Sequence, residues 1–103
     1  PLNLLQRLRL RANALFGLRS YRPARDDLME ALRLLRNVAT IASKLSATSM
    51  KKERLLIGEW VATQWATVTF NLSLCARYLA SPDEALVWLH CSKSALKSLS
   101  GII

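Results

Sequence analysis

The segment from Met50 to Glu84 has the strongest helix signals of the chain, and it reads MKKERLLIGEWVATQWATVTFNLSLCARYLASPDE. Its apolar residues recur at the three- and four-residue spacing of one helical face. That stripe consists of Met50, Ile57, Val61, Trp65, Val68, Leu72, Cys75 and Leu79. The segment Ser81–Glu84 then supplies a capping serine, a proline for the first helical position and two acids where the helix dipole favours them. The stretch therefore predicts a long helix over about residues 50–80, a very tight turn and a further helix.

Two more helices are expected before this stretch. Apolar residues on one face predict a first helix that ends at Gly17. A second helix is expected over about residues 23–46, with Pro23 at its first position and Asp26 and Asp27 in its first turn. Short connections between helices imply antiparallel neighbours. We therefore expect an all-α fold of four antiparallel helices.

The composition suits a single helical domain. The chain has 103 residues, of which 51% are hydrophobic and 21% charged, with only three Gly and three Pro. It begins with Pro rather than Met, lacks a signal-peptide pattern and holds two cysteines. We expect residues 1–103 to be one domain of a larger intracellular protein, with no membrane span.

The stretch from Arg11 to Ala31 resembles a tetratricopeptide repeat. Large and small residues alternate as they do in the two helices of such a repeat, and the matching positions are Leu8, Ala12, Leu15, Ala24, Leu28 and Ala31. A second, poorer match covers Thr69 to Ser92, at Leu72, Ser73, Ala76, Ala85 and Leu89. Ala24 and Ala85 are 61 residues apart, whereas tandem repeats recur at about 34 residues. The resemblance implies a pair of helical hairpins that serves protein interaction; a plain four-helix bundle explains the same stripes.

The long helix carries more apolar surface than one stripe requires. A second set lies away from Val61 and Leu72, and it consists of Leu56, Trp60, Phe70, Leu74 and Tyr78. These residues are either packed by neighbours on both sides of a central helix or form a groove that receives a partner helix.

The excess of basic residues is a second indication of a binding partner. The net charge of the chain is +8. Six arginines precede the first acid, Asp26: Arg7, Arg9, Arg11, Arg19, Arg22 and Arg25. Guanidinium groups bind carboxylate or phosphate in pairs of hydrogen bonds, although the same arginines also suit a solvated helix face. A second cluster, Lys51, Lys52 and Arg54, lies at the start of the long helix, where the dipole disfavours cations. We expect an acidic partner at that end.

Patterns for catalysis, cofactors and metals are missing from the sequence. His90 is the single histidine, and its neighbour Cys91 points about 100° away on a helix. There is no Gly-rich phosphate loop and no Ser–His–carboxylate set. We expect no catalytic, cofactor-binding or metal-binding residues.

These observations together predict a non-catalytic protein-interaction domain, a scaffold or adaptor, that docks a partner helix or an acidic peptide of another protein or of another domain in the same protein. One alternative is a basic helical domain that holds RNA or DNA through phosphate contacts. Another alternative is self-association through the long helix.

Overall fold

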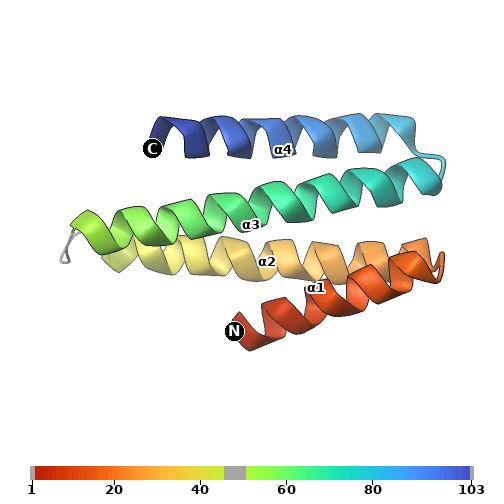
Figure 1. Cartoon of the computed structure of the whole chain (residues 1–103), viewed down its shortest axis with the longest axis horizontal. Helices are drawn as coiled ribbons and strands as arrows, with labels where there is room; N and C mark the ends of the chain where they lie inside the picture. The colour runs from red at the N-terminus through yellow and green to blue at the C-terminus, as the bar shows by residue number, and fades with distance from the viewer. Residues whose placement is uncertain (1, 46–50, 103) are drawn as a thin grey trace.

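The described part of the chain folds into four consecutive helices, as expected. The computed structural model describes residues 2–45 and 51–102, and within them the side chains of residues 3–41 and 57–98. The helices are α1 (Leu2–Gly17), α2 (Tyr21–Leu45), α3 (Lys51–Tyr78) and α4 (Pro82–Ile102). They lie side by side in chain order, with α1 and α4 at opposite edges (Figure 1). The all-α, four-helix prediction is confirmed.

The start of α2 differs from the prediction. The helix begins at Tyr21, so Pro23 lies within the first turn, where a missing N–H costs no helical hydrogen bond. Asp26 and Asp27 consequently fall beyond the first turn. Asp27 is instead 6% exposed and accepts two hydrogen bonds from Arg11 of α1. Asp27 therefore serves a tertiary contact rather than the helix dipole.

The start of α4 agrees with the prediction. The helix begins at Pro82 and carries Asp83 and Glu84 in its first turn. Ser81, just before it, accepts the first helical hydrogen bond at its carbonyl from the N–H of Ala85, at 3.0 Å. A proline and two acids at a helix start are local signals, which explains why the sequence alone located this end.

The turns that end α1 and α3 have the same backbone structure. After α1, Arg19 adopts a φ of 62°, and the N–H of Ser20 donates to the carbonyl of Leu15 at 2.8 Å. After α3, Ala80 adopts a φ of 61°, and the N–H of Ser81 donates to the carbonyl of Ala76 at 2.9 Å. Both are helix ends closed by a left-handed residue and a six-to-one hydrogen bond.

The two turns make the chain a pair of equivalent helical hairpins. Ser20 and Ser81 occupy the same place in each turn, 61 residues apart. Buried positions follow the same offset, because Leu8 corresponds to Thr69 and Ala12 to Ser73. The first hairpin is α1–α2 and the second is α3–α4.

The hairpins stack as an open array rather than a closed bundle. Among the described residues, the extensive helix contacts join α1 to α2, α2 to α3 and α3 to α4. The array measures 45 × 26 × 17 Å. In addition, α1 touches α3 through Arg9 and Gln64, and α2 touches α4 through Arg25 and Glu84. The first helices of the hairpins thus meet along one seam and the second helices along another.

Two kinds of interior hold the array together. The main core joins α1, α2 and α3 through leucines and small residues, and its buried members are Leu5, Leu8, Ala12, Ala24, Leu28, Ala31, Leu32, Leu35, Val68, Leu72 and Cys75. The buried residues on the α4 side of α3 are smaller: Ala66, Thr69, Ser73 and Ala76, with Ser92 on α4. The hydroxyl of Ser92 donates to the carbonyl of Ala66 at 2.9 Å. Small side chains let α4 lie close to α3.

No helix in the described part of the chain is both long and apolar enough to cross a membrane.

Candidate functional site

The residues of the second apolar set of α3 (Leu56, Trp60, Phe70, Leu74 and Tyr78) do not share one environment in the structure. Trp60 is half-buried and packs against the main core. Leu74 is half-buried and lines a depression beside α1, and Tyr78 contacts Phe16 of α1. Phe70 is 46% exposed and lies on none of these contacts. The side chain of Leu56 lies outside the described residues, so three of the five predicted residues lie toward α1.

The arginines of α1 lie on two faces of the helix, because residues two apart differ by about 200° and residues four apart by only about 40°. Arg9 lies toward α3 and donates from Nη1 to Oε1 of Gln64 at 2.5 Å. Arg11 lies toward α2 and binds Asp27 with two hydrogen bonds, of 2.8 and 2.6 Å. Arg7 is exposed and makes no ion pair within the described residues. The structure therefore does not gather Arg7, Arg9 and Arg11 into one basic surface.

The two-hairpin repeat explains the outer arginines. By the 61-residue offset, Arg7 and Arg11 take the positions that Val68 and Leu72 take on α3. Val68 and Leu72 are fully buried in the main core, whereas α1 is the edge of the array. Polar residues at these positions solvate an edge that no helix covers within the described chain. Arg11 also stabilises the first hairpin, and its pKa is raised by its hydrogen bond to Asp27.

The remaining predicted basic residues lie elsewhere. Arg19 is exposed in the first turn. Arg22 lines a shallow depression beside Arg25, Asp26 and Glu84, where acids offset its charge. The side chains of Lys51, Lys52 and Arg54 lie outside the described residues, and so does the acidic-partner surface predicted from them.

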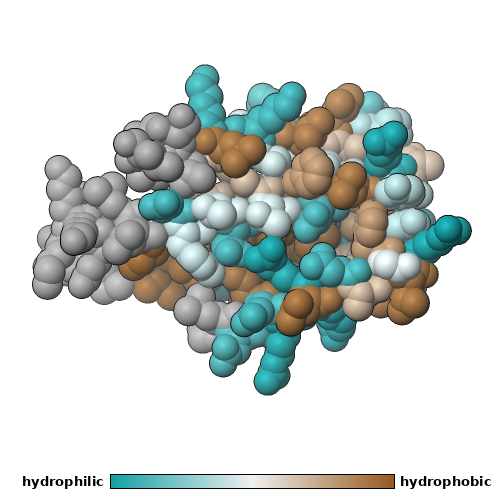
Figure 2. All heavy atoms as spheres, viewed as in Figure 1, coloured by the Kyte–Doolittle hydropathy of each residue, from teal (hydrophilic) through white to brown (hydrophobic). Residues whose placement is uncertain are grey.

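Two depressions lie along the seam between α1 and α3, and we call them together the α1–α3 groove. One depression, of about 320 Å³, is lined by Leu5, Gln6, Arg9, Trp60 and Gln64. A smaller one, of about 70 Å³, is lined by Ala12, Asn13, Phe16, Leu28, Asn71, Leu74 and Cys75. Hydrophilic surface runs between the positions of α3 and α1 across the middle of this face (Figure 2).

Four carboxamides border the α1–α3 groove in two matched pairs. Gln6 and Asn13 are seven residues apart on α1, and Gln64 and Asn71 are seven apart on α3. Seven residues are two helical turns, so each pair lies on one face. Gln64 accepts the hydrogen bond from Arg9; the side chains of Gln6, Asn13 and Asn71 make none within the described residues. The charge pattern and the apolar stripes of the sequence do not indicate these residues, although their seven-residue spacing is a signal.

Arg9 is incompletely paired in the groove. Its Nη1 has Gln64 as an acceptor, but its Nε is buried and has no hydrogen-bond partner. A buried donor without an acceptor costs free energy. No acidic residue lines either depression. The groove therefore contains one cation, Arg9, that lacks a hydrogen-bond acceptor at Nε and is surrounded by neutral polar and aromatic groups.

Three aromatic rings lie at the turn end of α1 and α3. Tyr21 and Tyr78 stack with their ring centroids 4.8 Å apart, and Phe16 meets both rings edge-on. Tyr78 is still 57% exposed. These contacts fix the ends of α1, α2 and α3 relative to one another and place an exposed aromatic beside the smaller depression.

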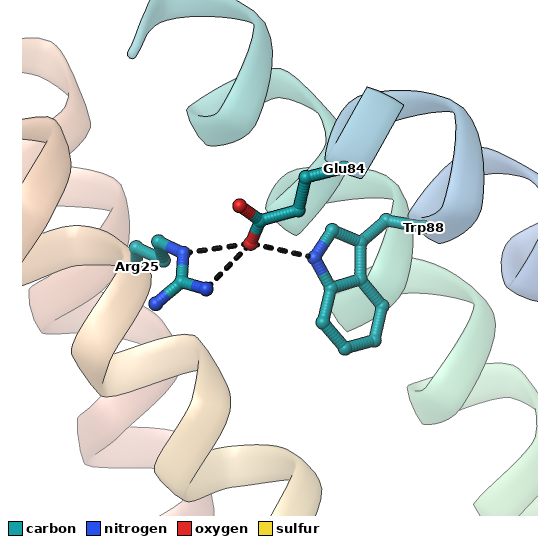
Figure 3. A network of polar contacts seen from close by, with 3 residues as sticks. All are labelled: Arg25, Glu84 and Trp88. Atoms are coloured by element: carbon teal, nitrogen blue, oxygen red, sulfur yellow. Dashed lines mark hydrogen bonds and ion pairs between the residues drawn. The ribbon is translucent and has the colours of Figure 1, made fainter. Parts of the chain in front are cut away.

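The opposite seam, between α2 and α4, is bridged by hydrogen bonds between its own polar side chains. Oε1 of Glu84 accepts from Nε and Nη2 of Arg25, at 2.8 and 2.5 Å, and from the indole N–H of Trp88 at 3.2 Å (Figure 3). The hydrogen bonds from Arg25 and Trp88 lower the pKa of Glu84. We call Arg25, Glu84 and Trp88 the α2–α4 network.

The histidine and cysteines form no cluster. His90 is exposed and Cys91 half-buried, while Cys75 is buried in the main core and burial raises its pKa. Within the described side chains, no three His, Cys, Asp or Glu residues are placed to hold a metal ion together.

Comparison with known proteins found no family model, no curated protein and no solved structure that matches the chain.

Proposed function

We propose that the chain is a protein-interaction domain that binds an acidic segment of a partner protein in the α1–α3 groove. The observation that carries this proposal is the state of the groove's polar groups. Arg9 and the carboxamides of Gln6, Asn13 and Asn71 keep hydrogen-bonding capacity that the described chain does not use. No acid lines the groove, so a carboxylate is the charge it would favour.

The distribution of charge supports an acidic partner on this side. The segments that form α1 and α3 contain seven Lys and Arg and two acids, Glu53 and Glu59. Those that form α2 and α4 contain seven Lys and Arg and five acids. Electrostatic complementarity mainly raises the association rate and selects partners by charge.

We further propose that the domain is a helical-repeat unit related in plan to tetratricopeptide repeats. The equivalent turns after α1 and α3 and the stacking of two hairpins support this plan. Its helices are longer than the family's 34-residue period accommodates, since α2 and α3 have 25 and 28 residues. In such arrays, the stacked helices form extended binding surfaces.

The test is an unbiased selection of peptides. Random twelve-residue peptides displayed on phage would be selected on the immobilised chain and the best sequence synthesised with a fluorescent label. We expect the selected sequences to be rich in Asp and Glu. Selection of basic or uncharged sequences would overturn the proposal.

A pair of variants ties binding to the groove. Arg9→Gln removes the groove's cation, and Arg36→Gln removes an exposed arginine of α2 that has no ion pair in the described chain. We expect Arg9→Gln to weaken the labelled peptide at least tenfold and Arg36→Gln less than twofold, with unchanged helical circular dichroism. Equal effects would place the site elsewhere.

The same samples separate the other two functions. A labelled RNA or DNA oligomer that bound tightly at low salt and lost affinity steeply with added salt would support phosphate binding instead. A dimeric mass by light scattering, with no peptide selected, would support self-association.

A further inference from the structure

The carboxamides of the α1–α3 groove suit one conformation of a bound segment. We propose that the partner segment lies in the groove as an extended strand, with its main-chain amides bonded to Asn13 and Asn71 and one carboxylate bonded to Arg9. This inference rests on the proposed function, and it specifies what the groove recognises.

The chemistry of the carboxamide favours a main chain as its partner. An Asn side chain offers an N–H₂ donor and a C=O acceptor side by side, and a peptide group offers the same pair. A helical partner has already used its main-chain groups internally. It would cover Asn13 and Asn71 without bonding them, and burying unpaired amides costs free energy. An extended segment has free N–H and C=O groups to offer.

The spacing of the groove residues fits an extended chain. Arg9 and Asn13 are one helical turn apart, about 6 Å along α1 at 1.5 Å per residue. An extended chain advances about 3.3 Å per residue, so this interval matches two residues. Side chains two apart on a strand point to the same side. A carboxylate at Arg9 therefore places the main chain two residues further along beside Asn13.

The two borders of the groove can act on one segment. α1 and α3 both run toward the turn end of the molecule, where Phe16 meets Tyr78. Asn13 and Asn71 line the same small depression from opposite sides. A strand that passes between them has a carboxamide on each side.

Arg9, on which the proposed function rests, also places a carboxylate at this point of the groove. Its buried Nε lacks an acceptor, and its Nη1 is held by Gln64. A shift of the Arg9 side chain would expose the edge formed by Nε and Nη2 to a carboxylate, which would accept two hydrogen bonds and relieve the unpaired donor. Gln64 would then fix the orientation of the guanidinium rather than compete for it.

A proline scan of the selected acidic peptide tests the inference. Proline removes a main-chain N–H and disrupts a helix interior, but it is compatible with an extended chain. For an extended segment, we expect at least a fivefold loss of affinity at one or two positions and less than a twofold change at most others. For a bound helix, every interior proline would cost at least tenfold, and that result would overturn the inference.

A coupling experiment locates the contact. The sensitive proline peptide would be measured against Asn13→Ala, Asn71→Ala and the control Asn37→Ala, an exposed asparagine of α2. We expect the fivefold loss to disappear in at least one groove variant and to persist in Asn37→Ala. Persistence of the loss in both groove variants would overturn the inference.

The inference and the proposed function fail in different ways. If no acidic peptide is selected, the proposed function is wrong and the inference falls with it. If acidic peptides are selected, require Arg9 and bind as helices, only the inference is wrong.

Discussion

The two seams of this molecule use their polar groups in opposite ways. On the α2–α4 seam, Arg25 and Trp88 both donate to Glu84, so the charges of Arg25 and Glu84 are paired within the described chain (Figure 3). On the α1–α3 seam, Asn13 and Asn71 have no partner within the described residues. Both seams join equivalent helices of the two hairpins. Two equivalent hairpins can therefore pair the polar groups of one seam and leave polar groups of the other seam unpaired within the described residues.

The largest expected effect comes from the core on which both seams depend. Leu72 is fully buried among residues of α1, α2 and α3. We expect Leu72→Ala to lower the free energy of unfolding by about 2–5 kcal/mol through lost burial and a cavity. Leu96→Ala, at a position 53% exposed on α4, should cost less than about 1 kcal/mol. Urea denaturation measures both, and equal effects would mean that Leu72 is not a core residue.

The second-largest effect on stability should come from the α2–α4 seam. We expect Glu84→Gln to destabilise the protein by about 1 kcal/mol, because Arg25 loses its carboxylate at a partly exposed site. Asp83→Asn removes the neighbouring acid from the same first turn without breaking the α2–α4 network. It should cost only a few tenths of a kcal/mol through the helix dipole. If the two variants denatured at the same urea concentration, the network would contribute no stability.

Acid should act on the same seam. The ordinary pKa of a glutamate side chain is 4.5. In the folded protein the pKa of Glu84 is lower, first because of its hydrogen bond from Arg25 and then because of that from Trp88. A depressed folded pKa contributes stability that is complete above the unfolded pKa and is lost as the pH falls through the folded pKa. We expect stability to fall as the pH drops below about 5, and to fall less in Glu84→Gln. Denaturation midpoints at pH 6 and pH 3 test this, and parallel losses would contradict it.

The smallest effect on stability is expected from a substitution on the α1–α3 seam. Asn71→Leu removes a carboxamide that bonds nothing in the described chain, so the free energy of unfolding should change by less than about 0.5 kcal/mol. The same variant should weaken peptide binding. A loss of more than about 1 kcal/mol would show that Asn71 is a structural residue rather than an available one.

Local signals explain which parts of the fold the sequence predicted well. The start of α4 was predicted from Pro82 and its neighbouring acids. The long helix α3 was predicted from the apolar stripe that includes Val68 and Leu72. The start of α2 was placed two residues late, because Pro23 suits several positions of a first turn. The offset of 61 residues between Ala24 and Ala85 was visible, but only the matching turns show that it relates two hairpins.

The candidate site was less predictable than the fold. The apolar pattern of the long helix indicated a second face, formed by Leu56, Trp60, Phe70, Leu74 and Tyr78. Of these, Trp60, Leu74 and Tyr78 lie toward α1, and the pattern did not indicate which helix lies opposite them. The carboxamides were missed because neutral polar residues resemble any solvated face until a groove brings them together. Their significance depends on which helix lies opposite them.

Four helices, the tight turn before α4 and the apolar stripes were predictable from the sequence, because caps, helical periodicity and side-chain size act within a few residues along the chain. The roles of the arginines depended on tertiary packing. Arg9 enters a groove, Arg11 pairs with Asp27 and Arg7 meets solvent. Neighbouring positions on a helix point in different directions, and what each meets depends on how distant segments pack.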